Sequence, residues 1–569
     1  MGIRVRIIDR EPQISPFSRA QGVLPRTLEI LAMIEDGFID KFLAQGKSLQ
    51  EANFYYGSRP RCTIPLGSIG VSRYEQPLFM EQERLSKVLA KELEEMGVPI
   101  EFGWELVDTE VVESVAGTEE SYVKTVIRQA VKPEDGEQEH QVIQSEYLVA
   151  ADGGRSTVRH KVNIKFPGRT LPHKNVMLDG IIDTDLELKD AVTITGVNQK
   201  TLLIFGLSDN IYRIIVEMED FTPEEDLGQI NRELTVKDFE HHARACLHPG
   251  TKFNVVKSTW LTCIRFNERR AERYIHEDRI FLAGDSAHVH SPAGGQGMNT
   301  GLQDAHNLAW KLALVLNKLA PPRLLQSYQE ERMPMADRAI ALSSKLLAGD
   351  RDQGTLDIRY PANSINLPHK TQTQPKEEVH QIGARAPDGP LLHLLPSASD
   401  LPSDNDAQAL AACKEQRVFV QELTVGVGRF HILVFVGNSL SNLALFKARE
   451  LELAQRIEEY LLQWRAQWHY TLSRDDNTDG QLVKVHVIAT GDTSESHGKG
   501  LLAQRAQGDG RLFWDSSAEV HASYGVPVLA KDQGAIVVIR PDSHIGFRVR
   551  GLDKGAWEDV AEYLQTILV

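Results

Sequence analysis

The chain has 569 residues, of which 41% are apolar and 25% charged, and this composition excludes a small binding module, a disordered protein and a collagen-like or coiled-coil fibre. At about 150 residues per domain, three to four structural units are expected. The formal net charge of -16 disfavours a general attraction to nucleic acid or to an anionic membrane surface, so small molecules are the expected ligands.

The first 165 residues have the pattern of a nucleotide-binding α/β unit. A β-branched run at 3–8 ends in Asp9, as the second strand of such a unit does. Apolar residues with helical spacing follow at 24–34 and 85–93, and a short buried strand is expected at 147–152, where it runs into a glycine pair. These elements predict one half of a doubly wound sheet.

The pattern changes at residue 166 to long alternating strands, which predict an antiparallel sheet domain over 166–275. A second short buried strand at 279–283 then leads through a glycine-rich loop into an apolar helix at 300–316. We therefore expect a discontinuous α/β domain, 1–165 and 276–349, into which the sheet domain is inserted.

Residues 350–382 are rich in Pro, Gln, Thr and Lys without periodicity, which predicts a linker. Residues 383–569 alternate between strands, as at 431–436 and 483–489, and helices, as near 556–568. They predict a last α/β domain, and we expect it to fold separately from the rest of the chain.

The four cysteines are far apart and have no disulfide or metal-ligand spacing. His288 and His290, two residues apart without a third ligand, are interpreted as polar loop positions rather than an iron site. No run approaches the roughly 18 apolar residues of a spanning helix, and the N-terminus has no signal-peptide pattern, so the expected compartment is the cytoplasm, with no membrane association.

The strongest local signal is GDSAH at 284–288, followed by PAGGQGMNTG at 292–301. A strand that ends in Gly284-Asp285 places a carboxylate where it can accept hydrogen bonds from a polyol, and a glycine-rich turn lets a helix N-terminus approach a ligand. A tight turn with a capping Asp explains the first pair alone, but not the whole string. We therefore predict a cofactor site formed by Gly284, Asp285, Gly295, Gly297, Met298 and Asn299.

This string resembles the class A flavoprotein aromatic hydroxylases, in particular their phenol 2-monooxygenase-like branch. Residues 279–307 are similar to the family segment that contacts the ribityl chain of FAD, and DGGRSTVR at 152–159 is similar to a segment implicated in FAD and NAD(P)H binding. The resemblance implies that FAD is the cofactor, that NAD(P)H is a co-substrate, and that Asp152 and Arg155 contact them.

Three further positions match family roles in FAD binding. Asp9 stands where an acidic residue binds the adenosine ribose. Arg19 stands where an arginine holds the pyrophosphate, a task that suits a guanidinium. Gln82 precedes a helix where the family often has a glutamine that contacts the flavin, although a solvated helix-start position explains it nearly as well.

The resemblance implies a monooxygenase: NAD(P)H reduces the flavin, O2 forms a C4a-hydroperoxide, and the distal oxygen attacks the ring of a small phenolic substrate. Pro292 would line the loop beside the reactive edge of the flavin. Tyr212 and Arg213, on a strand of the sheet domain, could face the substrate ring or be surface residues. The general base is unassigned, because Gln21 stands where some phenol hydroxylases have an acidic residue.

The segment from 383 to about 551 resembles the thioredoxin-like C-terminal domain of the same branch. Because it has no cysteine pair, we expect no thiol redox chemistry there, and a structural or homodimer-supporting role is implied.

The resemblance breaks at the start of the chain. Family members place a strand, a GxGxxG turn and a helix ahead of the position of Gly2, and no GxGxxG occurs near the start of this sequence. We therefore expect an N-terminally truncated FAD-binding domain with weak flavin affinity. A non-catalytic scaffold or dimerisation protein is the alternative, and a flavin oxidase or halogenase is disfavoured because a WxWxIP string is absent.

Overall fold

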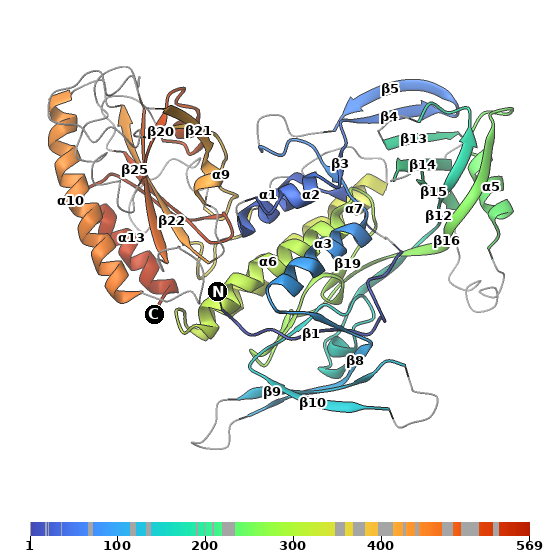
Figure 1. Cartoon of the computed structure of the whole chain (residues 1–569), viewed down its shortest axis with the longest axis horizontal. Helices are drawn as coiled ribbons and strands as arrows, with labels where there is room; N and C mark the ends of the chain where they lie inside the picture. The colour runs from blue at the N-terminus through green and yellow to red at the C-terminus, as the bar shows by residue number, and fades with distance from the viewer. Residues whose placement is uncertain are drawn as a thin grey trace.

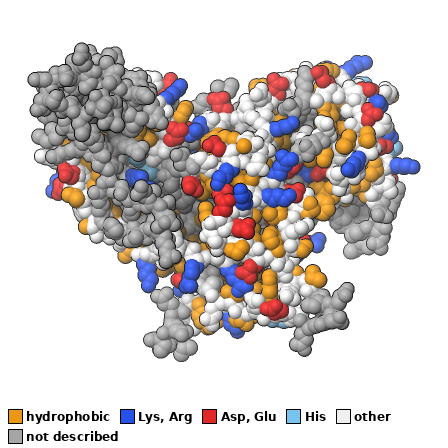
Figure 2. Space-filling model, in the orientation of Figure 1, with side chains coloured by type: hydrophobic (Ala, Val, Ile, Leu, Met, Phe, Trp, Pro, Cys, Tyr) orange, Lys and Arg blue, Asp and Glu red, His pale blue; other side chains and the backbone are white. Residues whose placement is uncertain are grey.

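The computed structural model of the chain describes residues 2–17, 20, 22–35, 37–66, 72–113, 121–131, 138–188, 192–197, 200–207, 210–218, 234–347, 359–367, 382–395, 414–424, 428–438, 443–468, 482–490, 511–526 and 534–569. The long helices α6 and α7 lie in the middle of the molecule, the C-terminal sheet with its helices on one side, and the large antiparallel sheet on the other (Figure 1). On the face drawn in Figure 2, basic and acidic side chains are intermixed over the central part rather than gathered by sign.

The central part contains two small parallel sheets. β1 (Ile7–Asp9) pairs with β7 (Ile100–Phe102), and β11 (Leu148–Ala150) pairs with β18 (Ile280–Leu282). β17 (Ile275–His276) adds antiparallel to β18. Because β11 and β18 come from the two sides of the sheet insertion and pair directly, this α/β unit is built from two separate stretches of the sequence.

The helices of this part pack around these strands. Their bounds are α1 (Pro25–Ile34), α2 (Asp40–Leu43), α3 (Gln82–Glu95), α4 (Thr157–Lys161), α6 (Gln296–Leu316) and α7 (Gln326–Leu347), with 3-10 turns at Gly284–Ser286 and Pro322–Leu325. α1 begins with Pro25, whose fixed φ suits the first helical position. Two three-stranded sheets complete this part: β2 (Gly22–Val23), β6 (Leu78–Phe79) and β3 (Lys47–Ser48), and β8 (Trp104–Val112), β9 (Tyr122–Gln129) and β10 (His140–Ser145).

The large sheet has eight strands in the order β19-β16-β12-β15-β14-β13-β4-β5. Their bounds are β4 (Glu51–Tyr56), β5 (Arg59–Pro65), β12 (Gly168–Thr184), β13 (Val192–Val197), β14 (Lys200–Gly206), β15 (Tyr212–Met218), β16 (Phe253–Arg270) and β19 (His288–Val289). α5 (Val236–Arg244) covers one face, where Phe239 joins a core with Leu178 and Ile214. The sheet also includes β4 and β5, which come from within the range 1–165, and β4 pairs parallel with β13.

The C-terminal sheet has seven strands in the order β21-β20-β24-β23-β22-β25-β26. The strands are β20 (Pro390–Leu395), β21 (Lys414–Phe419), β22 (Phe430–Asn438), β23 (Val483–Thr490), β24 (Arg511–Asp515), β25 (Ala535–Ile539) and β26 (Ile545–Arg550). The helices are α9 (Val420–Leu423), α10 (Leu443–Gln467), α12 (Glu519–Ser523) and α13 (Lys554–Ile567). β22, β23 and β24 run parallel, and α10 and α13 lie against the same side of the sheet (Figure 1).

The C-terminal domain shares a hydrophobic core with the central part. One cluster of buried side chains runs from Phe281 and Trp310 to Phe430 and Trp557. The rings of Trp310, on α6, and Phe430, on β22, meet edge to face at 6.2 Å. Undocking the two parts would expose this shared core to water, which opposes their separation. Whether the C-terminal domain folds separately stays a prediction.

Candidate functional site

The DG and GD motifs lie side by side at the carboxyl ends of β11 and β18. Asp152 follows β11 and Asp285 follows β18, and both side chains are exposed. The Ser286 hydroxyl donates to the Ala150 carbonyl at 2.6 Å, and the Ala283 N–H donates to the same oxygen at 2.9 Å. The carboxyl ends of parallel strands are where α/β sheets bind ligands, so both motifs are placed for that role.

Arg159 joins the two motifs, and the sequence interpretation did not single it out. Its guanidinium donates to the Ser286 carbonyl and to the Gly154 carbonyl, each at 2.8 Å, and it lies over the ring of Phe166 at 3.8 Å from the centroid. The side chain is buried, unlike that of Arg155, which is exposed. Arg159 therefore positions the two turns, and its signal was present as the last residue of the DGGRSTVR string.

The carboxylates of Asp152 and Asp9 each accept one hydrogen bond from the protein and have capacity for more. One oxygen of Asp152 accepts the Val158 N–H at 3.1 Å, and one oxygen of Asp9, at the end of β1, accepts the Glu11 N–H at 2.9 Å. In each case the second carboxylate oxygen has no hydrogen bond among the described residues. Exposed carboxylates of this kind can accept hydrogen bonds from the hydroxyl groups of a ligand.

The loop at 292–295 turns into the N-terminus of α6 through glycines. Gly294 and Gly295 have φ of +81° and +64°, a backbone conformation that favours glycine. A Cβ added at Gly295 or Gly297 would meet no atom within 4 Å, so space lies open against the first turn of the helix. The N–H groups of that turn lie at the positive end of the helix dipole, where they would stabilise a negatively charged ligand.

Asn299 is buried and fixes the start of α6. Its amide nitrogen donates to the Gly22 carbonyl at 2.9 Å and to the Gly295 carbonyl at 2.7 Å, and its amide oxygen accepts the Leu24 N–H at 2.9 Å. The side chain therefore holds the helix against β2 instead of facing the open space. Met298 is half-buried and packs against the apolar cluster formed by α1 and α3, and Pro292 is exposed.

Gln82 holds the backbone of the segment that precedes β2 and α1. Gln82 is the first residue of α3; its side-chain oxygen accepts the Ala20 N–H, and its own N–H donates to the Ala20 carbonyl, both at 3.2 Å. Gln82 thus fixes the backbone beside Arg19. Arg19 and Gln21 lie outside the described residues.

The structure corrects the pairing of Tyr212 with Arg213 as two residues facing one ligand. Successive side chains of a strand point to opposite faces of the sheet. Tyr212 packs with the core under α5, whereas Arg213 lies on the other face. There its guanidinium forms two hydrogen bonds to Asp179, at 2.8 and 2.6 Å, and lies over Trp260 at 5.6 Å.

Arg213 has an unused donor on that face. Its Nη1 atom is buried and has no hydrogen-bond partner among the described residues. Phe205, Asp179 and Trp260 stand beside it in the strand register, and Phe17, from the segment after β1, packs on Trp260 at 5.3 Å between ring centroids. This face of the sheet is therefore turned toward the central part of the molecule.

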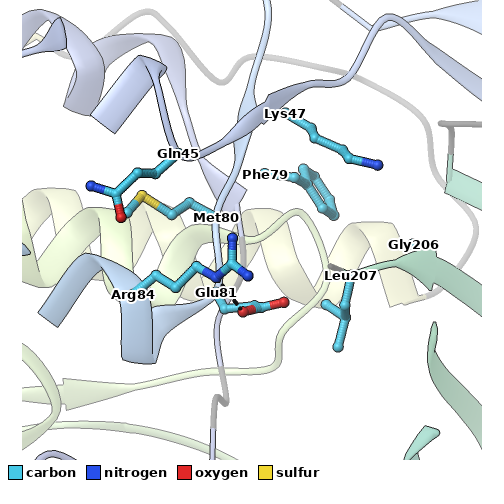
Figure 3. Close-up of a pocket in the computed structure, with 8 residues that line it drawn as sticks. All are labelled: Gln45, Lys47, Phe79, Met80, Glu81, Arg84, Gly206 and Leu207. Carbon is cyan, nitrogen blue, oxygen red and sulfur yellow. Dashed lines mark ion pairs between the residues drawn. The ribbon is translucent and has the colours of Figure 1, made fainter. Parts of the chain in front are cut away.

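A small pocket of about 70 Å³ lies at the junction of the central part and the large sheet. Figure 3 shows its lining, which consists of Gln45, Lys47, Phe79, Met80, Glu81, Arg84, Gly206 and Leu207. Phe79 stacks on Phe205 at 5.9 Å, which links the pocket to the face that carries Arg213. Glu81 and Arg84 form an ion pair at 3.1 Å on its charged side.

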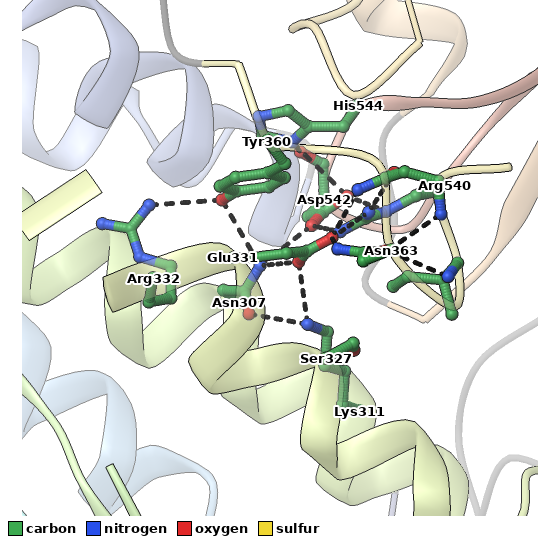
Figure 4. Close-up of polar contacts among 12 residues, drawn as sticks. Asn307, Lys311, Ser327, Glu331, Arg332, Tyr360, Asn363, Arg540, Asp542 and His544 are labelled. Carbon is green, nitrogen blue, oxygen red and sulfur yellow. Dashed lines mark hydrogen bonds and ion pairs between the residues drawn. The ribbon is translucent and has the colours of Figure 1, made fainter. Parts of the chain in front are cut away.

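Behind the site, the β25–β26 turn docks on α6 and α7 through a set of buried charges that we call the charge network: Lys311, Glu331, Arg540 and Asp542. Glu331 accepts two hydrogen bonds from Arg540, at 2.5 and 3.0 Å, and one from Lys311 at 2.8 Å, while Arg540 also pairs with Asp542 (Figure 4). Burial lowers the pKa of Lys311 to about 8 although Glu331 opposes the shift. Burial alone would raise the pKa of Glu331, but Arg540 and Lys311 hold it well below its usual range.

The described part of the chain holds no group of three or more His, Cys, Asp or Glu side chains arranged to bind a metal ion. Within the same residues, no helix combines the length and the apolarity that a membrane crossing requires.

Comparisons with known proteins match both parts of the chain. Residues 1–343 match the family model described as "FAD binding domain", and residues 403–569 match "Phenol hydroxylase, C-terminal dimerisation domain". A rifampicin monooxygenase of Streptomyces venezuelae is 32% identical over 342 residues, which are 60% of this chain and 65% of that protein. A phenol 2-monooxygenase, fsqG, of Aspergillus fumigatus is 26% identical over 548 residues, 95% of this chain and 89% of that protein.

The solved structures agree on the fold. A ternary complex of aklavinone-11 hydroxylase with FAD and aklavinone superimposes with a TM-score of 0.71 at 20% identity, over 99% of this chain and 94% of that chain. The chain aligns to somewhat less than two thirds of the rifampicin monooxygenase, 65%. The FAD binding domain model covers more than half of the chain. The chain therefore belongs to the FAD binding domain family of class A flavoprotein hydroxylases.

Proposed function

We propose that the chain is an FAD-dependent monooxygenase that hydroxylates a small phenolic or other aromatic compound with NAD(P)H and O2. The observation that carries this proposal is the meeting of Asp152 and Asp285 at adjacent strand ends, beside a helix N-terminus that Gly295 and Gly297 leave open. The relatives named as rifampicin and phenol monooxygenases support it.

The residues of this face fit FAD. Its ribose and ribityl hydroxyls can donate to the exposed carboxylates of Asp9, Asp152 and Asp285, whose second oxygens are available. The N-terminus of α6 stabilises negative charge on the flavin ring or its phosphates. When bound, FAD supplies the transfer of electrons from NAD(P)H to O2, which amino-acid side chains cannot perform.

We assign the following residues to this cofactor site, with Arg155 toward NAD(P)H: Asp9, Arg19, Gln82, Asp152, Arg155, Gly284, Asp285, Gly295, Gly297, Met298 and Asn299. Asn299 and Gln82 act by fixing the backbone of the site, since their side-chain amides are engaged with protein groups. Pro292, exposed in the loop before α6, borders the place of the flavin ring.

The substrate lies against the sheet face that carries Arg213. Asp179 fixes the guanidinium through two hydrogen bonds, and the buried Nη1 atom then donates to the phenolic oxygen. Such a charge-assisted bond favours the phenolate, which is the more electron-rich ring. Phe205 and Trp260 flank Arg213 and exclude water from this contact.

The C-terminal domain supports a homodimer and has a thioredoxin-like arrangement. The matched family model is named for dimerisation, and three parallel strands, β22 to β24, are continued by the antiparallel β25 and β26. The test is the mass of the protein in solution by light scattering, and a monomer at micromolar concentration contradicts the dimer.

The activity is tested with purified protein and added FAD. NADH or NADPH oxidation and O2 uptake are recorded with a panel of phenols, and the products are identified by mass spectrometry. We expect a hydroxylated product that carries 18O from 18O2.

Arg213→Lys keeps the charge but loses the fork that pairs with Asp179, so it should raise KM for the phenol and leave FAD affinity unchanged. A protein that binds no FAD and oxidises no NAD(P)H contradicts the proposal and favours a scaffold.

A further inference from the structure

The turn at 284–288, which belongs to the proposed cofactor site, is held by one buried carboxylate. An oxygen of Asp304, on α6, accepts the Gly284 N–H at 3.0 Å and the His288 Nε2 at 2.6 Å. The other oxygen accepts the Arg332 Nε at 2.6 Å. Burial alone would raise the pKa of Asp304, but His288 and Arg332 hold it below its usual range.

Close packing at the same place leaves this turn little freedom. A Cβ on Gly301, which lies about one helical turn before Asp304 on α6, would lie 3.3 Å from the Cα of Gly284. The turn at Gly284 therefore rests directly on the backbone of α6. A shift of Asp304 or of α6 must move the turn with it, because interiors packed at this density transmit displacement.

Arg332 connects Asp304 to the C-terminal domain. It donates to the Thr300 carbonyl of α6 at 3.3 Å and to the hydroxyl of Tyr360 at 3.2 Å. The Tyr360 ring stacks on His544, in the turn between β25 and β26, at 4.3 Å between centroids. Figure 4 shows Arg332 pointing to Tyr360, and Tyr360 lying against His544.

The charge network fixes the position of the β25–β26 turn itself. Arg540 and Asp542 lie in the turn and are buried, and Arg540 pairs both with Asp542 and with Glu331, the neighbour of Arg332 on α7. Removing the turn would leave Glu331 buried without its main counter-charge, which is strongly unfavourable. The docked turn thus has one position, and His544 and Tyr360 have one position with it.

We propose that Tyr360, Arg332 and Asp304 are positioning residues through which the docked β25–β26 turn sets the 284–288 turn for FAD. This inference rests on the proposed function in assigning FAD to that turn. The series of contacts from His544 through Tyr360, Arg332 and Asp304 to Gly284, which we call the relay, does not depend on that assignment. The C-terminal domain then acts on the cofactor site in addition to any role in dimerisation.

The test compares Tyr360→Phe with Tyr524→Phe. Tyr360→Phe removes only the hydroxyl that faces Arg332 and keeps the ring that stacks on His544. Tyr524 is an equally buried tyrosine whose hydroxyl donates to the Pro387 carbonyl at 2.9 Å, inside the C-terminal domain and away from Asp304. The two variants therefore lose one buried hydroxyl each, and the melting temperature of both is measured to match their stability.

Hydrogen exchange without FAD is the first readout. Tyr360→Phe should speed exchange of the amides at 284–288 at least threefold, while Tyr524→Phe leaves them unchanged. The second readout is FAD titration: Tyr360→Phe should weaken FAD binding at least threefold and alter the visible circular dichroism of the bound flavin, and Tyr524→Phe should do neither.

The outcomes separate the relay from the proposed function. Unchanged exchange at 284–288 in Tyr360→Phe, or equal effects of the two variants, overturns the relay. If Tyr360→Phe alone speeds exchange at 284–288 and the wild-type protein binds no FAD, the relay is supported and the proposed function is contradicted.

Discussion

The proposed cofactor face and the charge network behind it use the same residue types in opposite ways. On the cofactor face, Asp152 and Asp285 are exposed and keep carboxylate oxygens available for a ligand. In the charge network, Glu331 and Asp542 are fully buried, and cations of the chain itself occupy their oxygens. An exposed carboxylate that stays unpaired at a strand end is available for binding, whereas a buried, paired one fixes structure.

The largest effect on stability is expected from a change in the charge network. Glu331→Gln leaves Lys311 buried without its ion-pair partner and leaves Arg540 with Asp542 alone, so we expect a loss of about 3 to 5 kcal/mol in the free energy of unfolding. Urea denaturation measures it. Glu110→Gln, which removes an exposed ion pair with Lys124, is the matched control and should cost less than about 1 kcal/mol. Equal losses in the two variants would mean that the network contributes no more than a surface pair.

A buried histidine should also make the stability of the protein depend on pH. Burial lowers the pKa of His306, on α6, from 6.5 to about 4. Between these values the unfolded chain takes up a proton that the native protein does not, so stability falls as the pH drops from about 6.5 to about 4 and is fully retained above that window. The loss for this group is on the order of 3 kcal/mol.

Urea denaturation at pH 7 and pH 5 tests this expectation. His306→Gln should flatten the dependence, although the buried His431 and His544, whose pKa values burial also lowers, continue to contribute in the same direction. A variant with the full wild-type pH dependence would remove His306 as a source of it.

Changing the cofactor face should affect binding and leave stability alone. On the proposed assignment, Asp285→Ala removes a charge-assisted hydrogen bond to the ribityl chain, which is typically worth about 1.5 to 3 kcal/mol, so FAD affinity should fall by about 10- to 150-fold. Asp108→Ala, at an exposed carboxylate on β8, should leave the affinity unchanged. Flavin fluorescence titration measures both, and an unchanged Kd in Asp285→Ala contradicts the assignment.

The smallest expected effect concerns Arg155. Because its exposed side chain is assigned to NAD(P)H, Arg155→Ala should slow flavin reduction several-fold while FAD content changes little. Stopped-flow reduction measures this, with Arg128→Ala, at a half-buried position on β9, as the control. Equal losses of FAD content and reduction rate would show that Arg155 serves FAD instead.

The proposed cofactor face could be located from the sequence because its signals are local. Asp152 and Asp285 each close a short buried strand inside a motif of about ten residues, and the parallel pairing of β11 and β18 brings the two motifs together. The glycines at 294 and 295 were readable for the same reason, since a positive φ needs glycine wherever the chain turns this sharply.

The charge network could not be predicted in this way. Glu331 and Arg540 are 209 positions apart, and on a helix a glutamate ordinarily marks a solvated face. Only the docking of β25 and β26 on α7 shows that it is buried. The error over Tyr212 has a simpler cause: strand alternation places it opposite Arg213, but only the position of α5 shows which face is covered.

FAD is proposed to bind at the carboxyl ends of β11 and β18 and on the first turn of α6. Hydrogen exchange of the 569-residue chain, with FAD added well above its measured Kd, tests it most directly. We predict FAD-dependent protection of the amides at 151–158 and 284–299, with no change in α5 or in β8 to β10. Saturable FAD binding that protects neither segment would contradict the account.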